Sequence, residues 1–342
     1  MPTHRRLTGA AAAPAVALAV ALTAASALVL GPAGPASAAP ARGAAAAVPA
    51  GTAADGAHVV SETWLDARTV DLQISSPAVG GTVATRLLLP ADWSAQAGRT
   101  WPVLYLLQGA HDDYTSWTRE TDIEQFTAGQ EVIVAMPSSG PTGIPSTWWN
   151  YGSDHPDYET FQVTELMQLL QQDYRAGTTR AIGGVSTGGW AAMAFAARHP
   201  GTFAAAASYS GVLDTTMPGM PTVVEAIVAR ESLDPLSLWG SPVLNYALWS
   251  AENPFDVASG LRGTKLYLSS GTGVAGGNGE LSAEALETAL WPGSQAFALR
   301  LALLGIPVQT HFYTGGTHSW TYWKEEYKTS WPLISQALGL NS

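Results

Sequence analysis

Short apolar runs separated by segments with helical spacing restrict the fold of this chain more than any other feature. Residues 102–107 (PVLYLL) and 131–136 (EVIVAM) are apolar almost throughout, as expected for strands buried on both faces. Further strand candidates are residues 179–185, 203–209, 265–270 and 307–313. Strands that alternate with helices form a mostly parallel sheet with helices on both faces. The sequence therefore predicts one α/β domain built around such a sheet.

Helical segments lie between these strands, and two strands of a different kind come first. Residues 69–75 and 82–89 alternate apolar and polar side chains, which is typical of an antiparallel edge. The segment 214–253 lies between two strands and is expected to form a small helical insertion. The predicted helices are residues 161–174, 189–198, 282–303 and 320–338.

The first 38 residues have the organisation of an export signal. Arg5 and Arg6 precede an apolar stretch over residues 10–30, and residues 36–38 (ASA) form a small-x-small cleavage site. An uncleaved membrane anchor is the alternative, because about 20 apolar residues can span a bilayer. Alanine dominates the stretch, however, and is a weak membrane residue. We predict a signal peptide over residues 1–38, no membrane span after cleavage, and a secreted protein exported by the Sec or the twin-arginine (Tat) route.

Composition divides the rest of the chain into a leader and a folded domain. It also excludes several classes of function. Residues 39–57 are mostly alanine, glycine, proline and threonine, which predicts a flexible leader. Residues 58–342 are long enough to bury a core and form the predicted folded domain. The chain has no cysteine and a formal charge of −11, so disulfides, a thiol nucleophile and a basic nucleic-acid surface are excluded. No metal-ligand spacing is present, and we expect no metal and no cofactor.

A G-x-S-x-G motif carries the chemistry of this sequence. Residues 184–188 read GVSTG and lie between a predicted strand and an alanine-rich helix, which is the context of a nucleophile elbow. Ser186 is then exposed at the edge of the sheet as a candidate nucleophile. The amide of Thr187, at the start of the helix, is a candidate donor to an oxyanion. A plain Gly/Ser turn is the alternative interpretation.

A serine nucleophile requires a base, and the sequence offers seven histidines. His318 lies in a Thr/Gly loop after the last predicted strand, where a fold with this motif delivers its base. The acid between serine and histidine stays open at this point. No carboxylate follows the strand at 265–270 until Glu280, and Glu284 and Glu287 lie three residues apart on one predicted helix face.

The loop after the strand at 102–107 is expected to supply the second oxyanion donor. It begins Gln108-Gly109-Ala110-His111. Gly109 leaves the backbone accessible, so the amide of Ala110 is the natural donor. His111 follows it directly.

Several segments together resemble a known family. LYLLQGAHDDYTSW, the Trp148-Trp149 pair with YETFQVTEL, GVSTGG, LWG, AEALETAL and GGTHSWTYW resemble the secreted, antigen 85-like mycolyltransferases and their esterase D-type relatives. The resemblance runs from about residue 60 to residue 335. It implies an α/β-hydrolase fold with Ser186 as nucleophile, His318 as base and Glu287 as the acid, and Glu284 and Glu280 become the reserves.

The sequence departs from this family in the loop that holds a sugar acceptor. The family's aspartate is Gln108 here, and the bulky residues whose amides form its oxyanion hole are Ala110 and Thr187. Backbone donors survive such changes, whereas a sugar acceptor is less well supported. We therefore expect hydrolysis before transfer. Tryptophans could line an apolar acyl pocket or belong to the core; they are Trp148, Trp149, Trp239, Trp249, Trp320 and Trp323.

The sequence thus predicts a secreted serine esterase or acyltransferase of the α/β-hydrolase superfamily. Its expected substrate is a small-molecule or lipid ester, cleaved through an acyl-serine intermediate. One alternative is transfer of the acyl group to a sugar or glycerol hydroxyl, and another is a non-catalytic binding protein on the same fold. The candidate substrate-binding residues are Gln108, His111, Trp149 and Trp320.

Overall fold

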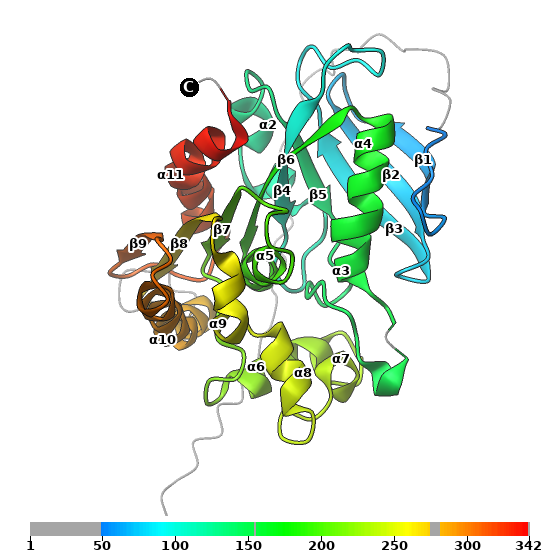
Figure 1. Ribbon diagram of the computed structural model, residues 1–342. Helices are drawn as coiled ribbons and strands as arrows, with labels where there is room; N and C mark the ends of the chain where they lie inside the picture. The colour runs from blue at the N-terminus through cyan, green and yellow to red at the C-terminus, as the bar shows by residue number, and fades with distance from the viewer. Residues whose placement is uncertain (1–48, 154, 274–280, 341–342) are drawn as a thin grey trace, which may run out of the picture. The chain divides into compact units, whose positions relative to one another are not determined.

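A computed structural model describes residues 49–153, 155–273 and 281–340, and a nine-stranded sheet forms its centre (Figure 1). The strand order is β1-β2-β3-β5-β4-β6-β7-β8-β9. The strands are β1 His58–Trp64, β2 Thr69–Ser76, β3 Gly81–Leu88, β4 Trp101–Leu107, β5 Ile133–Pro137, β6 Ala176–Val185, β7 Ala205–Tyr209, β8 Lys265–Gly271 and β9 Gln309–Tyr313. The predicted signal peptide, residues 1–38, lies outside the described residues.

The sheet has a parallel part and an antiparallel edge, as the sequence pattern predicts. Strands β5, β4, β6, β7, β8 and β9 are parallel to one another, whereas β1, β2 and β3 form an antiparallel meander whose last strand, β3, pairs antiparallel with β5. The α/β-hydrolase fold class is thereby confirmed. Strand β1 was not predicted, because most of its side chains are exposed or half-buried and its sequence lacks a clean alternation.

Helices cover both faces of the sheet. They are α1 Ser116–Glu120, α2 Ile123–Phe126, α3 Tyr158–Thr160, α4 Leu166–Asp173, α5 Thr187–Arg198, α6 Met220–Arg230, α7 Leu236–Trp239, α8 Tyr246–Glu252, α9 Pro254–Val257, α10 Leu281–Leu303 and α11 Trp320–Leu338. Helices α4, α5 and α10 contribute to the core on one face, and α1, α2 and α11 contribute to the core on the other. Within the described part of the chain, no helix is both long and apolar enough to cross a membrane.

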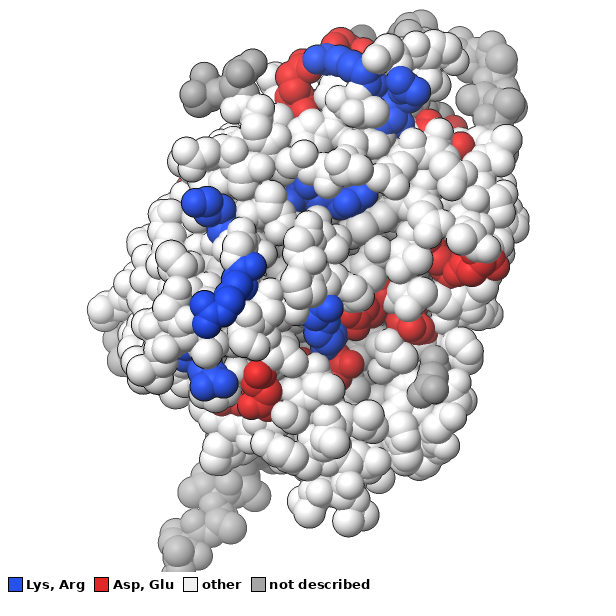
Figure 2. Space-filling view, viewed as in Figure 1, with Lys and Arg blue, Asp and Glu red and all other residues white. Residues whose placement is uncertain are grey.

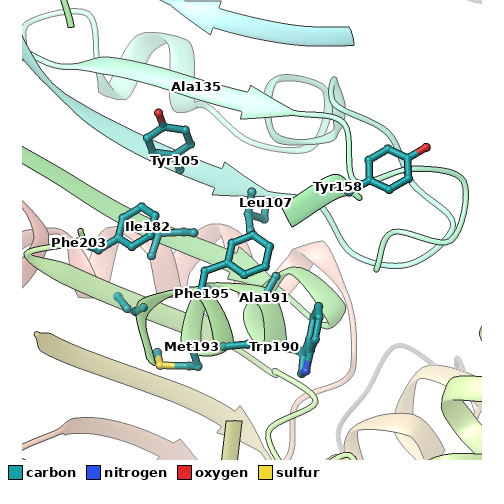
Figure 3. Packing of buried hydrophobic residues seen from close by; sticks show 14 of the residues in the cluster. Tyr105, Leu107, Ala135, Tyr158, Ile182, Trp190, Ala191, Met193, Phe195 and Phe203 are labelled. Atoms are coloured by element: carbon teal, nitrogen blue, oxygen red, sulfur yellow. The ribbon is translucent and has the colours of Figure 1, made fainter. Parts of the chain in front are cut away.

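Helix α5 lies against the centre of the sheet, and its composition explains how closely it approaches. It packs on β4, β6 and β7, and its alanines are buried. Figure 3 shows Ala191 and Phe195 on the side of α5 that faces Leu107 of β4 and Ile182 of β6. Small side chains let the helix backbone come near the strands while one aromatic ring fills the remaining space. The start of α5 is therefore held in a fixed position relative to the end of β6.

Residues 51–57 are packed against α4, in contrast to the flexible leader predicted for residues 39–57. The amide of Gly51 donates to Asp173 Oδ1 at 3.0 Å, and the amide of Ala54 donates to Gln168 Oε1 at 2.8 Å. Ala53 and Ala57 are buried. The small side chains that resemble a linker in composition also allow the backbone to approach the polar face of α4. Residues 39–48 lie outside the described part.

The predicted insertion is present and carries α6, α7 and α8. Its core is aromatic: the rings of Trp239 and Trp249 meet edge to face at 5.0 Å, and Trp239 lies 5.4 Å from Trp190 of α5. Arg198 joins the insertion to the main domain, because its guanidinium pairs with Glu252 of α8 and with Glu159 of α3. The insertion is therefore fixed to the domain at its base.

Candidate active site

Ser186 occupies the tight turn between β6 and α5. Its φ and ψ are 55° and −120°, a backbone region that costs a non-glycine residue of order 1–3 kcal/mol and is found at functional turns. The turn is held in place because the Ser186 amide donates to the carbonyl of Tyr209 at 2.9 Å. Such a turn at the carboxyl edge of the sheet is what the G-x-S-x-G motif predicts. Ser186 itself is buried, at 7% exposure, and not exposed as expected, because neighbouring loops cover the turn.

The glycines of the motif are required by the close approach of neighbouring backbones. A Cβ on Gly184 would lie 2.3 Å from the carbonyl oxygen of Gly188. A Cβ on Gly188 would lie 2.4 Å from the carbonyl oxygen of Gln108. Both contacts are with backbone atoms, which cannot move aside as the end of a side chain can.

The Gly188→Ala variant is therefore expected to lose about 1–3 kcal/mol of the free energy of unfolding, because the added methyl group overpacks the turn. Gly98→Ala is a matched control, since a Cβ there meets no atom within 4 Å, and its stability should change by less than about 0.5 kcal/mol. Urea unfolding followed by tryptophan fluorescence measures both values. Equal stability of the two variants would contradict the close approach.

Three side chains from distant parts of the sequence form a chain of hydrogen bonds. His318 Nε2 lies 2.8 Å from Ser186 Oγ, and His318 Nδ1 lies 2.9 Å from Glu287 Oε2. An ionised carboxylate can only accept, so Nδ1 carries the proton and Nε2 accepts from the serine hydroxyl. The structure thus brings together the serine, the histidine and one of the three candidate acids that the sequence offered.

Glu287 is the best-held member of this chain. It is fully buried, and its Oε1 accepts hydrogen bonds from Ser210 Oγ at 2.8 Å, Ser270 Oγ at 3.0 Å and the Gly271 amide at 2.7 Å. Burial raises the pKa of Glu287, but the hydrogen bond and charge of His318 together with these donors outweigh burial and hold the pKa below its ordinary value. Glu287 is therefore kept ionised.

The other two candidate acids are Glu284 and Glu280. Among the described residues, no hydrogen bond joins the Glu284 carboxylate to His318; the Glu284 carbonyl instead accepts from Thr288 Oγ1 within α10. Glu280 lies outside the described residues. The geometry therefore supports Glu287 over Glu284.

Residues that hold the acid and the base were not predicted from the sequence. Ser210 and Ser270 were missed, although they lie at the carboxyl ends of adjacent strands β7 and β8, where side chains converge on a site in this class of fold. Trp323 donates from Nε1 to Ser210 Oγ at 3.1 Å and presents its ring edge-on to His318 at 4.9 Å. Trp323 thus supports the hydrogen-bond chain, a role that neither of its two predicted alternatives, acyl pocket or core, included.

The predicted oxyanion donors are the backbone amides of Ala110 and Thr187. A Cβ on Gly109 would lie 3.2 Å from the Cβ of Ser186, so the loop at Gly109-Ala110 lies directly against the serine. Thr187 begins α5, whose first amides have no partner within the helix. Among the described residues, neither the Ala110 amide nor the Thr187 amide donates a hydrogen bond to another group.

The predicted substrate-binding residues occupy different surroundings. Gln108 is buried and lines a cavity of about 410 Å³ together with Tyr114 and Tyr158. Its Nε2 donates to the Asp112 carbonyl at 2.5 Å, and its Oε1 has no partner in the described part of the chain. His111 adopts a φ of 61°, and its Nδ1 hydrogen-bonds Glu231 of the insertion. Burial, together with the charge of Arg230, lowers the pKa of His111 more than Glu231 raises it.

The tryptophans divide between buried and half-buried positions. Trp148, Trp239 and Trp249 are buried and belong to the core. Trp149 is half-buried, lies 5.1 Å from the ring of Tyr151 and donates from its amide to the Leu238 carbonyl. Trp320 is half-buried and meets Trp117 edge to face at 5.1 Å.

The sequence as a whole agrees with this site. The model of the Esterase family matches residues 76–330, which is more than half of the chain. The chain belongs to the Esterase family. The match contains Ser186, Glu287 and His318, and it confirms the family resemblance found in the motifs.

Individual relatives are named as esterases and as acyltransferases. The chain is 30% identical over 267 residues to the esterase Rv1288 of Mycobacterium tuberculosis, covering 76% of this chain and 58% of that protein. It is 29% identical over 291 residues to the diacylglycerol acyltransferase/mycolyltransferase Ag85A of Mycobacterium leprae, covering 78% and 83% respectively. The crystal structure of MPT51 (FbpC1) of Mycobacterium tuberculosis has the same fold, with a TM-score of 0.63, 24% identity and coverage of 77% and 96%. The chain thus spans little more than half the length of the esterase relative.

Proposed function

We propose that this family member hydrolyses carboxylic esters through an acyl-serine intermediate. Ser186 is the nucleophile, His318 the general base and Glu287 the acid that orients it. The observation that carries the proposal is the continuous hydrogen-bond chain from Glu287 through His318 to Ser186. A serine hydroxyl becomes reactive only when an adjacent base accepts its proton, and this chain supplies that base.

The steps follow from the positions of the donors and acceptors. Ser186 Oγ attacks the ester carbonyl while its proton moves to His318 Nε2, and the amides of Ala110 and Thr187 donate to the oxyanion. Each such donor is worth about 3 kcal/mol of the barrier. The imidazolium then protonates the leaving alkoxide, which leaves the acyl group on Ser186. Water, deprotonated by the same imidazole, attacks the acyl-serine and releases the carboxylic acid.

Acyl transfer to an alcohol is the second candidate, and two observations favour it. One relative at 29% identity is named a diacylglycerol acyltransferase/mycolyltransferase. Gln108 lines a cavity, and its buried amide oxygen has no partner among the described residues. A sugar or glycerol hydroxyl that reached this oxygen would donate to it. A non-catalytic binding protein is less well supported, since such a protein has no need of an ionised Glu287 aligned with His318.

Turnover of p-nitrophenyl butyrate with and without added glycerol or trehalose separates these functions. We expect release of p-nitrophenol without an acceptor, and butyrate as the main product by mass spectrometry. Negligible release until an acceptor is added, with the acyl group recovered on that acceptor, would instead assign the chain as a transferase. No labelling of the folded protein by a fluorophosphonate would favour the binding protein.

We also propose that residues 1–38 are an export signal and that the protein acts outside the cytoplasm. The arginine pair, the apolar stretch and the small-x-small site support this proposal.

A further inference from the structure

The turn between α7 and α8 concentrates exposed apolar side chains. Of the twelve large apolar residues that are exposed in the described part of the chain, six lie within residues 233–248. Val243 and Leu244 are the most exposed of all, at 82% and 87%. We call this set the apolar tip; it comprises Leu233, Leu236, Val243, Leu244, Tyr246 and Leu248. Single exposed apolar residues are ordinary, but a cluster of this kind marks an interaction surface.

The apolar tip is almost without charge. No lysine or arginine occurs between Arg230 and Arg262, and Asp234 is the only charged residue within residues 233–250. The Asp234 carboxylate is engaged by the hydroxyl of Tyr151. Figure 2 shows the lower end of this face, over the turn between α7 and α8, covered by uncharged residues. A partner of this surface must therefore be apolar and must tolerate the acidic character of the whole chain, whose formal charge is −11.

The base of the insertion borders the candidate active site. Glu231, just before the tip, hydrogen-bonds His111, which follows the oxyanion donor Ala110 in sequence. The amide of Trp149 donates to the carbonyl of Leu238 at 2.8 Å. The buried rings of Trp239 and Trp249 hold the tip from beneath. A partner that binds the apolar tip is therefore held close to the loop that carries Ala110.

The size of the apolar tip discriminates between a second protein copy and a lipid surface. A stable protein dimer buries about 20–30 residues on each side, whereas the tip offers six exposed apolar side chains. A lipid interface needs far fewer, because a few aliphatic residues enter the acyl boundary while an amphipathic ring lies at the headgroup level. Val243 and Leu244 supply exposed aliphatic side chains at the turn, and Tyr246, two residues further along, supplies an exposed amphipathic ring.

We propose that the apolar tip docks the protein on a lipid surface of low net charge, and that it places the active site beside ester substrates held in that surface. The occupant is a zwitterionic or neutral lipid layer. The only charge of the tip is acidic, so an anionic lipid layer would not attract it electrostatically. Docking goes beyond the proposed ester hydrolysis, because it depends on the tip residues and not on Ser186.

Vesicle flotation tests the docking without any reaction. The Ser186→Ala protein is mixed with phosphatidylcholine vesicles, and the fraction that floats with them is measured. We expect binding, and we expect Val243→Asp combined with Leu244→Asp to lower the apparent partition coefficient about ten-fold or more. The matched control is Leu299→Asp combined with Leu303→Asp on α10, which also replaces two exposed leucines, at 61% and 75% exposure. The control should float as the parent does.

Several outcomes would overturn the docking. They are no flotation of the parent protein, an equal loss in both double variants, and tighter binding to phosphatidylserine than to phosphatidylcholine vesicles. A concentration-dependent dimer that only the tip variant abolishes would assign the tip to a second copy. Unchanged melting temperatures establish that both variants are folded. In the active protein, turnover of a soluble short-chain ester should survive the tip substitutions, so a failure of docking is distinguishable from a failure of the proposed chemistry.

Discussion

Replacement of Ser186 by alanine should lower kcat for a soluble p-nitrophenyl ester by about 10⁵-fold or more, because the acyl-serine can no longer form. The remaining groups still bind the ester and donate to its oxyanion, so a small rate above that in water should persist. The fold should survive, since the alanine side chain is smaller than the one that it replaces. Stopped assays with the purified variant, checked against its melting temperature, measure the effect.

A matched serine tests whether this loss is specific to the elbow. Ser208 lies on β7, is fully buried, and its hydroxyl has no hydrogen-bond partner in the described segments. Ser208→Ala should therefore keep its activity and its labelling by a fluorophosphonate, whereas Ser186→Ala should lose both. Labelling that persists after the change at Ser186 would mean that another nucleophile carries the reaction.

The central sheet and the nucleophile turn could be predicted from the sequence because both depend on local patterns. Continuous apolar runs are required wherever helices cover both faces of a strand, and β4 and β5 satisfy that condition. The elbow was predictable because Gly184 and Gly188 are imposed by backbone contacts that no other residue permits. Local geometry of this kind restricts the residue type at the same positions, so it can be recognised in the sequence.

The surroundings of the acid could not be predicted because they depend on contacts between distant segments. Ser210 and Ser270 lie at the ends of two adjacent strands, and both donate to Glu287, which lies on a separate helix. Neither serine belongs to a distinctive motif. Trp239 and Trp249 are similar: an aromatic residue in an insertion can line a pocket or fill a core, and only the packing beneath the tip decides. Likewise, residues 51–57 have the composition of a linker and are nonetheless packed, because alanine suits both environments.

Replacement of Glu287 by glutamine should lower kcat about 10⁴-fold with little change in KM, through the tautomer of His318. The donors Ser210, Ser270 and Gly271 would hold the amide oxygen in the Oε1 position, so the amide nitrogen would face His318 Nδ1. Nδ1 would then have to accept, and Nε2 would carry the proton and could not take one from Ser186. Burst and steady-state kinetics at pH 7.5 measure this loss.

The same variant tests the charge of Glu287 through the dependence of stability on pH. The folded pKa of Glu287 lies below the ordinary value of 4.5, so its stabilising contribution is present above that value and is lost as the pH falls through the lowered folded pKa. The stability advantage of the native protein over Glu287→Gln should therefore shrink as the pH falls below the ordinary value of 4.5. Glu284→Gln is the matched control, three residues earlier on α10, and should retain both the activity and the acid dependence of the native protein. If Glu284→Gln lost activity as severely as Glu287→Gln, His318 would have to take its acid from the other carboxylate.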